Sequence, residues 1–130
     1  MTYYRDEVAR LNKALYPHDD LTKQIKAAKL YIDKHFSEDI NLNKIAGKAL
    51  VSKFHFIRLF KKYYGCTPNQ YLQKVRIEKA KKILQKRKSI DEVCAAVGFT
   101  SKTSFISLFK KMTGKTPLTY QNKKAILNSI

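Results

Sequence analysis

The side chains with the most distinctive chemistry in this sequence lie within residues 52–63. Four of them fall on one face of a helix at their spacing: Lys53, Phe54, Ile57 and Arg58. An arginine can bridge O6 and N7 of guanine, and Phe or Ile can contact the methyl group of thymine. Large apolar side chains on an outward face are costly unless something covers them. The segment therefore predicts a surface that contacts bases in a major groove, with Phe54 folded back onto the core as the alternative.

The same pattern returns 49 positions later, in residues 101–112. Within the two segments, Ser52 matches Ser101 and Phe60 matches Phe109. The agreement continues beyond both segments, in these pairs: Gly65 with Gly114, Pro68 with Pro117 and Tyr71 with Tyr120. The equivalent outward positions of the second copy are Lys102, Thr103, Ile106 and Ser107. Because Ser107 replaces Arg58, we expect the second copy to bind less strongly. The two copies share the same framework residues but differ on their outer faces. This pattern indicates two binding surfaces of the same type that recognise different targets.

Hydroxyl and lysine side chains flank both outward faces. We expect the following residues to contact phosphates: Ser52, Lys61, Lys62, Ser101, Ser104 and Lys110. For the lysines, simple solvation of the charge is the alternative interpretation.

The charge of the chain is strongly one-sided. The formal net charge is +17, and residues 40–90 contain fourteen Lys and Arg but a single acidic residue, Glu78. So much like charge on a folded region repels itself unless a polyanion is the partner. The hydrophobic fraction of 44% is enough for a core, which argues against global disorder. The composition favours nucleic acid over a merely solubilising surface, which usually mixes signs.

The sequence offers no pattern for catalysis, a metal or a cofactor. Cys66 and Cys94 are isolated and the three histidines are scattered, so zinc ligation is not supported. There is no glycine-rich phosphate loop and no apolar run of membrane-spanning length. Two thiols without a signal peptide indicate a reducing, cytoplasmic location. We therefore expect a protein that is not an enzyme and does not enter a membrane.

Apolar periodicity predicts an all-α fold, with no segment typical of a strand. Ser52 and Ser101 are placed to cap two helices that Gly65 and Gly114 end, and Ser89 with Glu92 forms a capping box. Asp20 or Thr22 should cap an earlier helix, which turns Ile25, Ala28, Ile32 and Phe36 inward. Asn41 should cap a short helix built on Leu42, Ile45, Ala46 and Ala49. The expected core stripes of the repeated helices are Phe56, Leu59, Phe60, Tyr63 and Phe105, Leu108, Phe109, Met112.

The repeat divides the chain into two helix-turn-helix subdomains joined by one long helix. Residues 1–20 form a helical extension or linker, 21–66 the first subdomain, and 67–87 the linking helix that Thr67-Pro68 opens and that ends near Lys86. Residues 88–130 form the second subdomain with a C-terminal helix.

With these motifs the sequence resembles the AraC/XylS-type transcription regulators over roughly residues 22–125. The fragment Val97-Gly98-Phe99-Thr100-Ser101, followed by Phe105 and Phe109, is similar to the family's signature. The resemblance implies a bacterial DNA-binding domain of about seven helices whose two recognition helices enter adjacent major-groove segments. The sequence departs from the family pattern at Leu50, where the family often has Gly, and at Ser107, where Arg is common.

The resemblance further implies double-stranded DNA and RNA polymerase as partners, and a role as an activator. One chain carries two recognition helices, so we expect a monomer on a non-palindromic site. Residues 1–20 are too few for a ligand pocket, so the chain is either a short stand-alone regulator or the end of one with a sensory domain. Two other functions stay open: a basic helical module that binds nucleic acid without sequence choice, and a helical protein-interaction domain anchored by Phe54 and Ile57.

Overall fold

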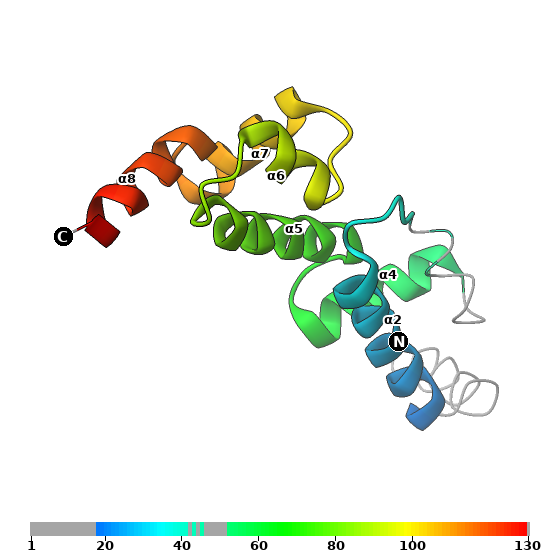
Figure 1. Ribbon diagram of the computed structural model, residues 1–130. Helices are drawn as coiled ribbons and strands as arrows, with labels where there is room; N and C mark the ends of the chain where they lie inside the picture. Colours follow the sequence, from blue (N-terminus) through cyan, green and yellow to red (C-terminus); the bar gives the residue numbers. More distant parts are fainter. Residues whose placement is uncertain (1–17, 42, 44, 46–51, 130) are drawn as a thin grey trace. The chain divides into compact units, whose positions relative to one another are not determined.

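The computed structural model describes residues 18–41, 43, 45 and 52–129 of the chain, and these residues form six helices without a strand. The helices are α2 (His18–His35), α4 (Lys53–Tyr64), α5 (Pro68–Leu84), α6 (Ile90–Ala96), α7 (Lys102–Thr113) and α8 (Pro117–Ser129) (Figure 1). The predicted all-α class with two helix-turn-helix units is confirmed. Residues 1–17 of the predicted extension lie outside the described residues, as do Leu42, Ala46, Ala49 and Leu50 of the predicted short helix and turn.

The chain divides into two compact units, and the structure describes each by itself. The first unit takes its described residues from 18–32 and from 41–68, and the second contains 33–40 and 69–129. Segment 33–40 therefore packs with the second unit although it continues from α2. The subdomain boundaries given above remain predictions.

The first unit is held together by apolar side chains of α2 and α4. Ile25 and Ile32 of α2 are buried, as are Phe56 and Phe60 of α4. The Phe60 ring also packs against Tyr64, with 4.9 Å between the ring centroids. Since each fully buried side chain of this size contributes about 1.5–3 kcal/mol, these contacts fix which face of α4 turns inward.

The second unit has one apolar core to which four helices contribute. Its fully or nearly fully buried members come from α5, α6 and α7: Ile77, Ala80, Leu84, Val93, Cys94, Val97, Phe105 and Phe109. Tyr120 of α8 completes this core with an edge-on contact to Phe109 at 5.5 Å. Figure 1 shows α6 and α7 lying together beside α5. Phe105 and Phe109 thus fix which face of α7 turns inward, as Phe56 and Phe60 do for α4.

The ends of α4 and α7 are built in the same way. Ser52 Oγ accepts a hydrogen bond from the His55 N–H at 3.1 Å, and Ser101 Oγ accepts one from the Ser104 N–H at 3.3 Å. Gly65 and Gly114 end the two helices in the left-handed region, at φ 76° and 83°. The N-caps and C-caps predicted from the repeat are therefore confirmed.

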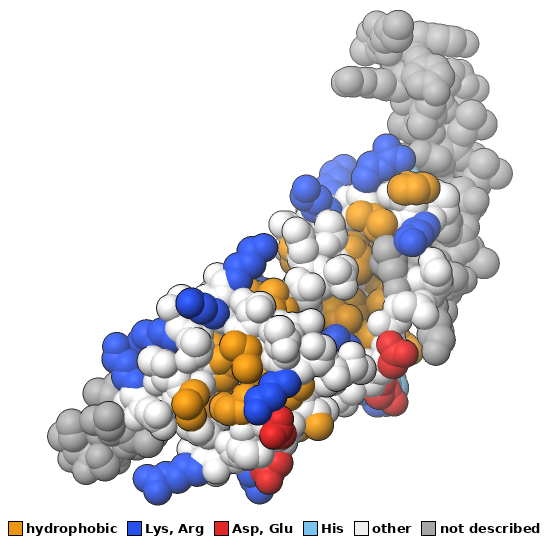
Figure 2. All heavy atoms as spheres, turned by 90° about the horizontal axis from the view of Figure 1, so that it is seen from above, with side chains coloured by type: hydrophobic (Ala, Val, Ile, Leu, Met, Phe, Trp, Pro, Cys, Tyr) orange, Lys and Arg blue, Asp and Glu red, His pale blue; other side chains and the backbone are white. Residues whose placement is uncertain are grey.

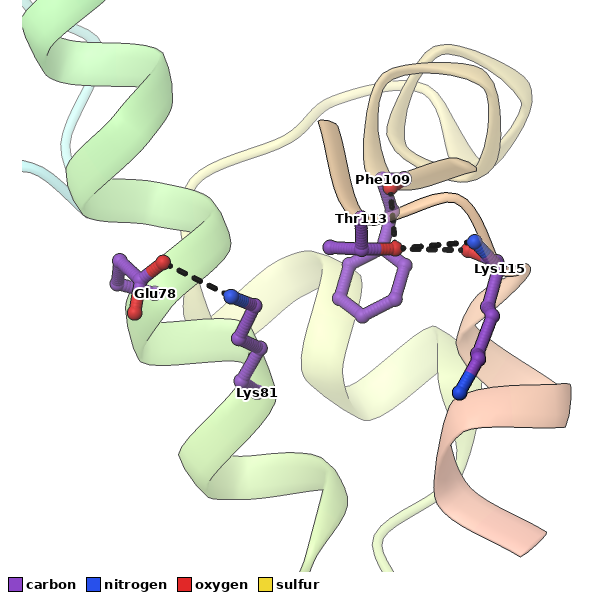
Figure 3. A network of polar contacts seen from close by, with 5 residues as sticks. All are labelled: Glu78, Lys81, Phe109, Thr113 and Lys115. Carbon is purple, nitrogen blue, oxygen red and sulfur yellow. Dashed lines mark hydrogen bonds and ion pairs between the residues drawn. The ribbon is translucent and has the colours of Figure 1, made fainter. Parts of the chain in front are cut away.

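An additional set of hydrogen bonds closes the C-terminal end of α7. The Thr113 hydroxyl lies 2.7 Å from the Phe109 carbonyl and 3.0 Å from the Lys115 carbonyl, and it accepts from the Lys115 N–H. Figure 3 shows these contacts, together with the ion pair between Lys81 and Glu78 on α5 at 2.9 Å. The Thr113 side chain thus links the last residue of α7 to the backbone of Lys115, just after Gly114.

Two predicted core positions are wrong. Tyr63 is 42% exposed and Met112 is 45% exposed, although both continue the apolar spacing of their helices. Both lie in the last turn before the terminal glycine, where the chain leaves the core. In the first unit Tyr64 packs on Phe60 instead, while the Tyr63 hydroxyl contacts Thr22 Oγ1 at 2.9 Å.

Two predicted helix boundaries also differ. Helix α2 begins at His18, so Asp20 and Thr22 lie inside it rather than at its N-cap, and Thr22 uses its hydroxyl for Tyr63. Helix α5 ends at Leu84 rather than near Lys86. A turn follows, in which Arg87 adopts a left-handed φ of 58°.

The turn of the second helix-turn-helix is held against segment 33–40. Gly98, at φ +89°, approaches the Phe36 carbonyl oxygen so closely that a Cβ would lie 2.9 Å from it. Arg76 of α5 donates to the same carbonyl from Nε at 2.8 Å and to the Glu38 carbonyl at 3.0 Å. Its guanidinium also lies 5.6 Å from the centroid of the Phe99 ring. The path from α6 to α7 is therefore fixed by backbone contacts as well as by the core.

We expect Gly98→Ala to destabilise the second unit more than Gly114→Ala. Both substitutions place a side chain in the left-handed region, which costs about 1–2 kcal/mol. Only Gly98→Ala also drives a Cβ into backbone, since nothing lies within 4 Å of the Cβ position at Gly114. The added overlap should cost at least about 1 kcal/mol more. Urea unfolding followed by circular dichroism measures the difference, and equal losses would contradict the close approach.

Candidate nucleic-acid interface

Helix α4 exposes the predicted base-contacting face of the first unit. Lys53, Phe54 and Arg58 are exposed, and Ile57 is half-buried. The Phe54 side chain is 73% exposed, so it does not fold back onto the core. The four side chains share one face because Phe56 and Phe60 hold the opposite face inside. Phe54 lies beside Lys53 and Arg58 on this surface. Its exposed apolar area can be buried only against a partner molecule.

Helix α7 presents the equivalent face with different chemistry. Lys102, Thr103 and Ser107 are exposed, and Ile106 is half-buried. Ile106 and the stem of Lys102 line a shallow hollow of about 200 Å³ beside Pro117 and the exposed Leu118. The face is smaller and less charged than that of α4, as the replacement of Arg58 by Ser107 predicts.

The predicted phosphate contacts lie at the ends of the two helices and on their exposed sides. All six of these residues are exposed: Ser52, Lys61, Lys62, Ser101, Ser104 and Lys110. Neither α4 nor α7 carries an acidic residue in its first turn. The partial positive charge of each N-terminus is therefore available to an anion. The serines that cap the helices keep a hydroxyl proton that can be donated.

The surface around these helices is predominantly basic. Figure 2 shows one face of the molecule, on which Lys and Arg side chains are spread widely and Asp and Glu side chains are few. Three lysines of α5 are exposed, namely Lys74, Lys79 and Lys82. Glu78 is the one exposed acidic residue of this helix. A surface with this balance attracts polyanions and makes their binding sensitive to salt.

One acidic residue beside α7 was not singled out by sequence reasoning. Asp91, in the first turn of α6, lies with Oδ1 3.2 Å from Lys102 Nζ. The pair joins a predicted base-contacting residue to the preceding helix of the same unit. The sequence signal for this contact is the acidic residue that precedes Glu92 of the predicted capping box. Ser89 Oγ does accept from the Glu92 N–H at 3.1 Å, so that part of the capping prediction is confirmed.

The two cysteines are free thiols, with Cys94 buried and Cys66 half-buried. Burial raises the pKa of the Cys94 thiol, Asp91 raises it further, and Lys102 opposes the change. Cys94 donates instead to the Phe99 carbonyl at 3.5 Å, which supports the turn before α7. Among the described residues, no three His, Cys, Asp or Glu side chains gather to hold a metal ion. No helix within these residues is long and apolar enough to cross a membrane.

Each unit exposes a helix with a serine N-cap, a glycine C-cap and a basic last turn. A family model of a helix-turn-helix domain matches residues 45–123, which is more than half of the chain. The chain belongs to this family, in its AraC-type branch of DNA-binding domains found in transcription regulators.

Relatives and solved structures agree with this assignment. The chain is 41% identical over 69 residues to the bifunctional transcriptional activator/DNA repair enzyme AdaA of Bacillus subtilis, covering 52% of this chain and 33% of AdaA. An AraC-type regulator from Chromobacterium violaceum has a similar structure, with TM-score 0.71 and 28% identity over 80% of this chain and 94% of that one. The DNA-binding domain of AdpA, solved with a target DNA, gives TM-score 0.73 and 26% identity over 76% and 90% of the two chains. The chain spans only part of the length of the curated relatives it matches.

We expect Phe54→Ala and Phe56→Ala to separate binding from stability. Phe56 is fully buried, so its truncation should cost about 3–5 kcal/mol of unfolding free energy. Phe54 is mostly exposed, so its truncation should leave the unfolding free energy within about 0.5 kcal/mol while weakening DNA binding. Chemical denaturation and a gel-shift titration on the same two variants test this. Phe54→Ala with full DNA affinity would remove Phe54 from the interface.

Proposed function

We propose that this chain binds double-stranded DNA sequence-specifically as a monomer and reads two adjacent major-groove segments with α4 and α7. The observation that carries the proposal is the combination of equal scaffolds and unlike outer faces. Capping serines, buried phenylalanine pairs and terminal glycines are the same in both helices. The exposed positions differ, with Phe54 and Arg58 in one helix and Thr103 and Ser107 in the other. A nonspecific polyanion binder would have no use for two differing faces in this arrangement.

Each exposed side chain has a role that follows from its chemistry. Arg58 bridges a guanine, while Phe54 and Ile57 contact thymine methyl groups, and Lys53 adds a donor at the base edges. In the second segment Lys102, Thr103, Ile106 and Ser107 make fewer charge-assisted contacts. The residues proposed to hold the phosphate backbone on both sides are Ser52, Lys61, Lys62, Ser101, Ser104 and Lys110.

We further propose that the protein acts in the cytoplasm as a transcription activator that contacts RNA polymerase. The similarity to AdaA, a transcriptional activator, supports the direction of regulation. The similar region spans 33% of AdaA, which gives no support for a DNA repair activity in this chain. Catalysis is therefore no part of the proposal.

Selection from a pool of random duplexes, followed by competition at fixed salt, tests this function. A sequence-specific regulator should prefer its selected site over random DNA by about 10³-fold or more. A nonspecific basic module should show no preference and an affinity set by salt alone. A protein-interaction domain should bind its partner with little change between low and moderate salt. Either of the last two results would replace the proposed function.

Arg58→Ala and Lys61→Ala should weaken binding in different ways. Losing a guanine contact costs about 1–3 kcal/mol on the selected site and relaxes the preference at one base pair. Losing a phosphate contact weakens binding to every sequence about equally and reduces the salt slope by about one. Titrations of both variants on selected and random duplexes at several salt concentrations give the comparison. Equal effects of the two variants on both duplexes would show that Arg58 does not contact a base.

The selected site should be non-palindromic and bound by one chain. Two recognition helices in tandem cover groove segments about one helical turn, ~34 Å, apart. Because the outer faces differ, the two segments should carry different sequences. Footprinting combined with the mass of the complex measures both properties. A palindromic site occupied only by two chains would contradict the tandem arrangement.

A further inference from the structure

The ion pair between Asp91 and Lys102 occupies one of the predicted DNA contacts of α7. The two charged groups lie 3.2 Å apart, and their side chains are 76% and 53% exposed. Lys102 is the first residue of α7, where an ammonium group lies beside the free N–H groups of the helix terminus. An anion that approaches this terminus therefore meets a lysine that already has a carboxylate partner.

The first unit has no acidic residue at the matching position. In the sequence, the segment predicted to form a short helix before residue 52 aligns with residues 90–96 at a spacing of 48, so that Asn43 corresponds to Asp91 and Lys44 to Glu92. Asn43 is exposed and carries no charge. The carboxylate at Asp91 is thus a difference between the two copies, as is the replacement of Arg58 by Ser107.

We propose that Asp91 competes with DNA for the Lys102 ammonium, which on a random duplex pairs with a phosphate rather than with a base edge, and so lowers the affinity of the second unit for DNA of any sequence. The inference rests on the proposed function in taking DNA as the ligand of α7. Asp91 is a positioning residue in this role, since it acts through the Lys102 ammonium and touches no base. Its effect is to weaken the general attraction of the second unit to phosphate.

The size of the effect follows from the exposure of the pair. Exposed ion pairs contribute little free energy, so Asp91→Asn should tighten binding to random DNA by only about 1.4- to 5-fold. A released Lys102 can neutralise a further phosphate and displace a counterion. The slope of log affinity against log salt should therefore become steeper by up to about 0.9.

A double-mutant cycle on a random duplex tests whether Asp91 acts through Lys102. The cycle uses the full chain with Asp91→Asn, Lys102→Gln and both changes together, each measured at several salt concentrations. We expect Asp91→Asn to tighten binding in the presence of Lys102 and to have almost no effect once Lys102 is replaced by Gln. If Asp91→Asn tightens binding equally in both backgrounds, Asp91 acts only as a general negative charge and the proposal fails.

Glu92→Gln supplies the matched control for charge. Glu92 is the next residue of the same turn and is also exposed, and its backbone N–H, not its carboxylate, makes the capping contact. It should tighten binding less than Asp91→Asn and without the steeper salt slope, whereas equal effects would overturn the proposal. Repeating the cycle on the selected duplex separates this inference from the proposed function. Absence of any preference for that duplex would refute sequence-specific binding, while the cycle on random DNA would still decide the role of Asp91.

Discussion

The burial of two phenylalanines, four residues apart, on α4 and again on α7 is the constraint on which the proposed DNA interface depends. Phe56 and Phe60 in α4, and Phe105 and Phe109 in α7, have no exposed surface. A helix with one face anchored in this way cannot rotate about its axis without exposing two aromatic rings. The exposed face of each helix is consequently fixed by residues that never meet a ligand.

The distribution of charged residues differs between the two units. Helices α4 and α7 both begin without an acidic residue in the first turn and carry two lysines in the last turn, Lys61–Lys62 and Lys110–Lys111. The second unit adds the acidic first turn of α6 next to Lys102 and replaces Arg58 by Ser107. Attraction to phosphate is long-ranged and independent of sequence, whereas base contacts are local. The chain has a net charge of +17. If this general attraction is reduced while base contacts are kept, the preference for a specific site over random DNA increases.

The sequence predicted the features that depend on near neighbours along the chain. The caps at Ser52 and Ser101 and the ends at Gly65 and Gly114 follow from contacts three or four residues apart, and all of them are found. The fate of Tyr63 and Met112 could not be predicted from spacing, because their exposure depends on where the core ends. The same holds for Arg76, whose carbonyl partners lie 38 and 40 residues away. The Asp91–Lys102 pair depends on how α6 packs against α7, which periodicity does not specify. The roles of the exposed side chains in DNA contact stay predictions.

The residues that stabilise each unit and the residues proposed to read DNA form separate sets. Phe105, Gly98 and Arg76 fix the position of α7 through the core, the tight turn and the carbonyls of segment 33–40. Thr103 and Ser107 are exposed and contribute nothing to that core. Substitutions on the outer face can therefore alter the bases recognised with little effect on folding, because surface changes away from structural contacts usually shift stability by less than about 0.5 kcal/mol. Duplication of such a unit supplies a second helix whose outer face can diverge while its core residues stay the same. In this chain the outer faces differ at Arg58 and Ser107.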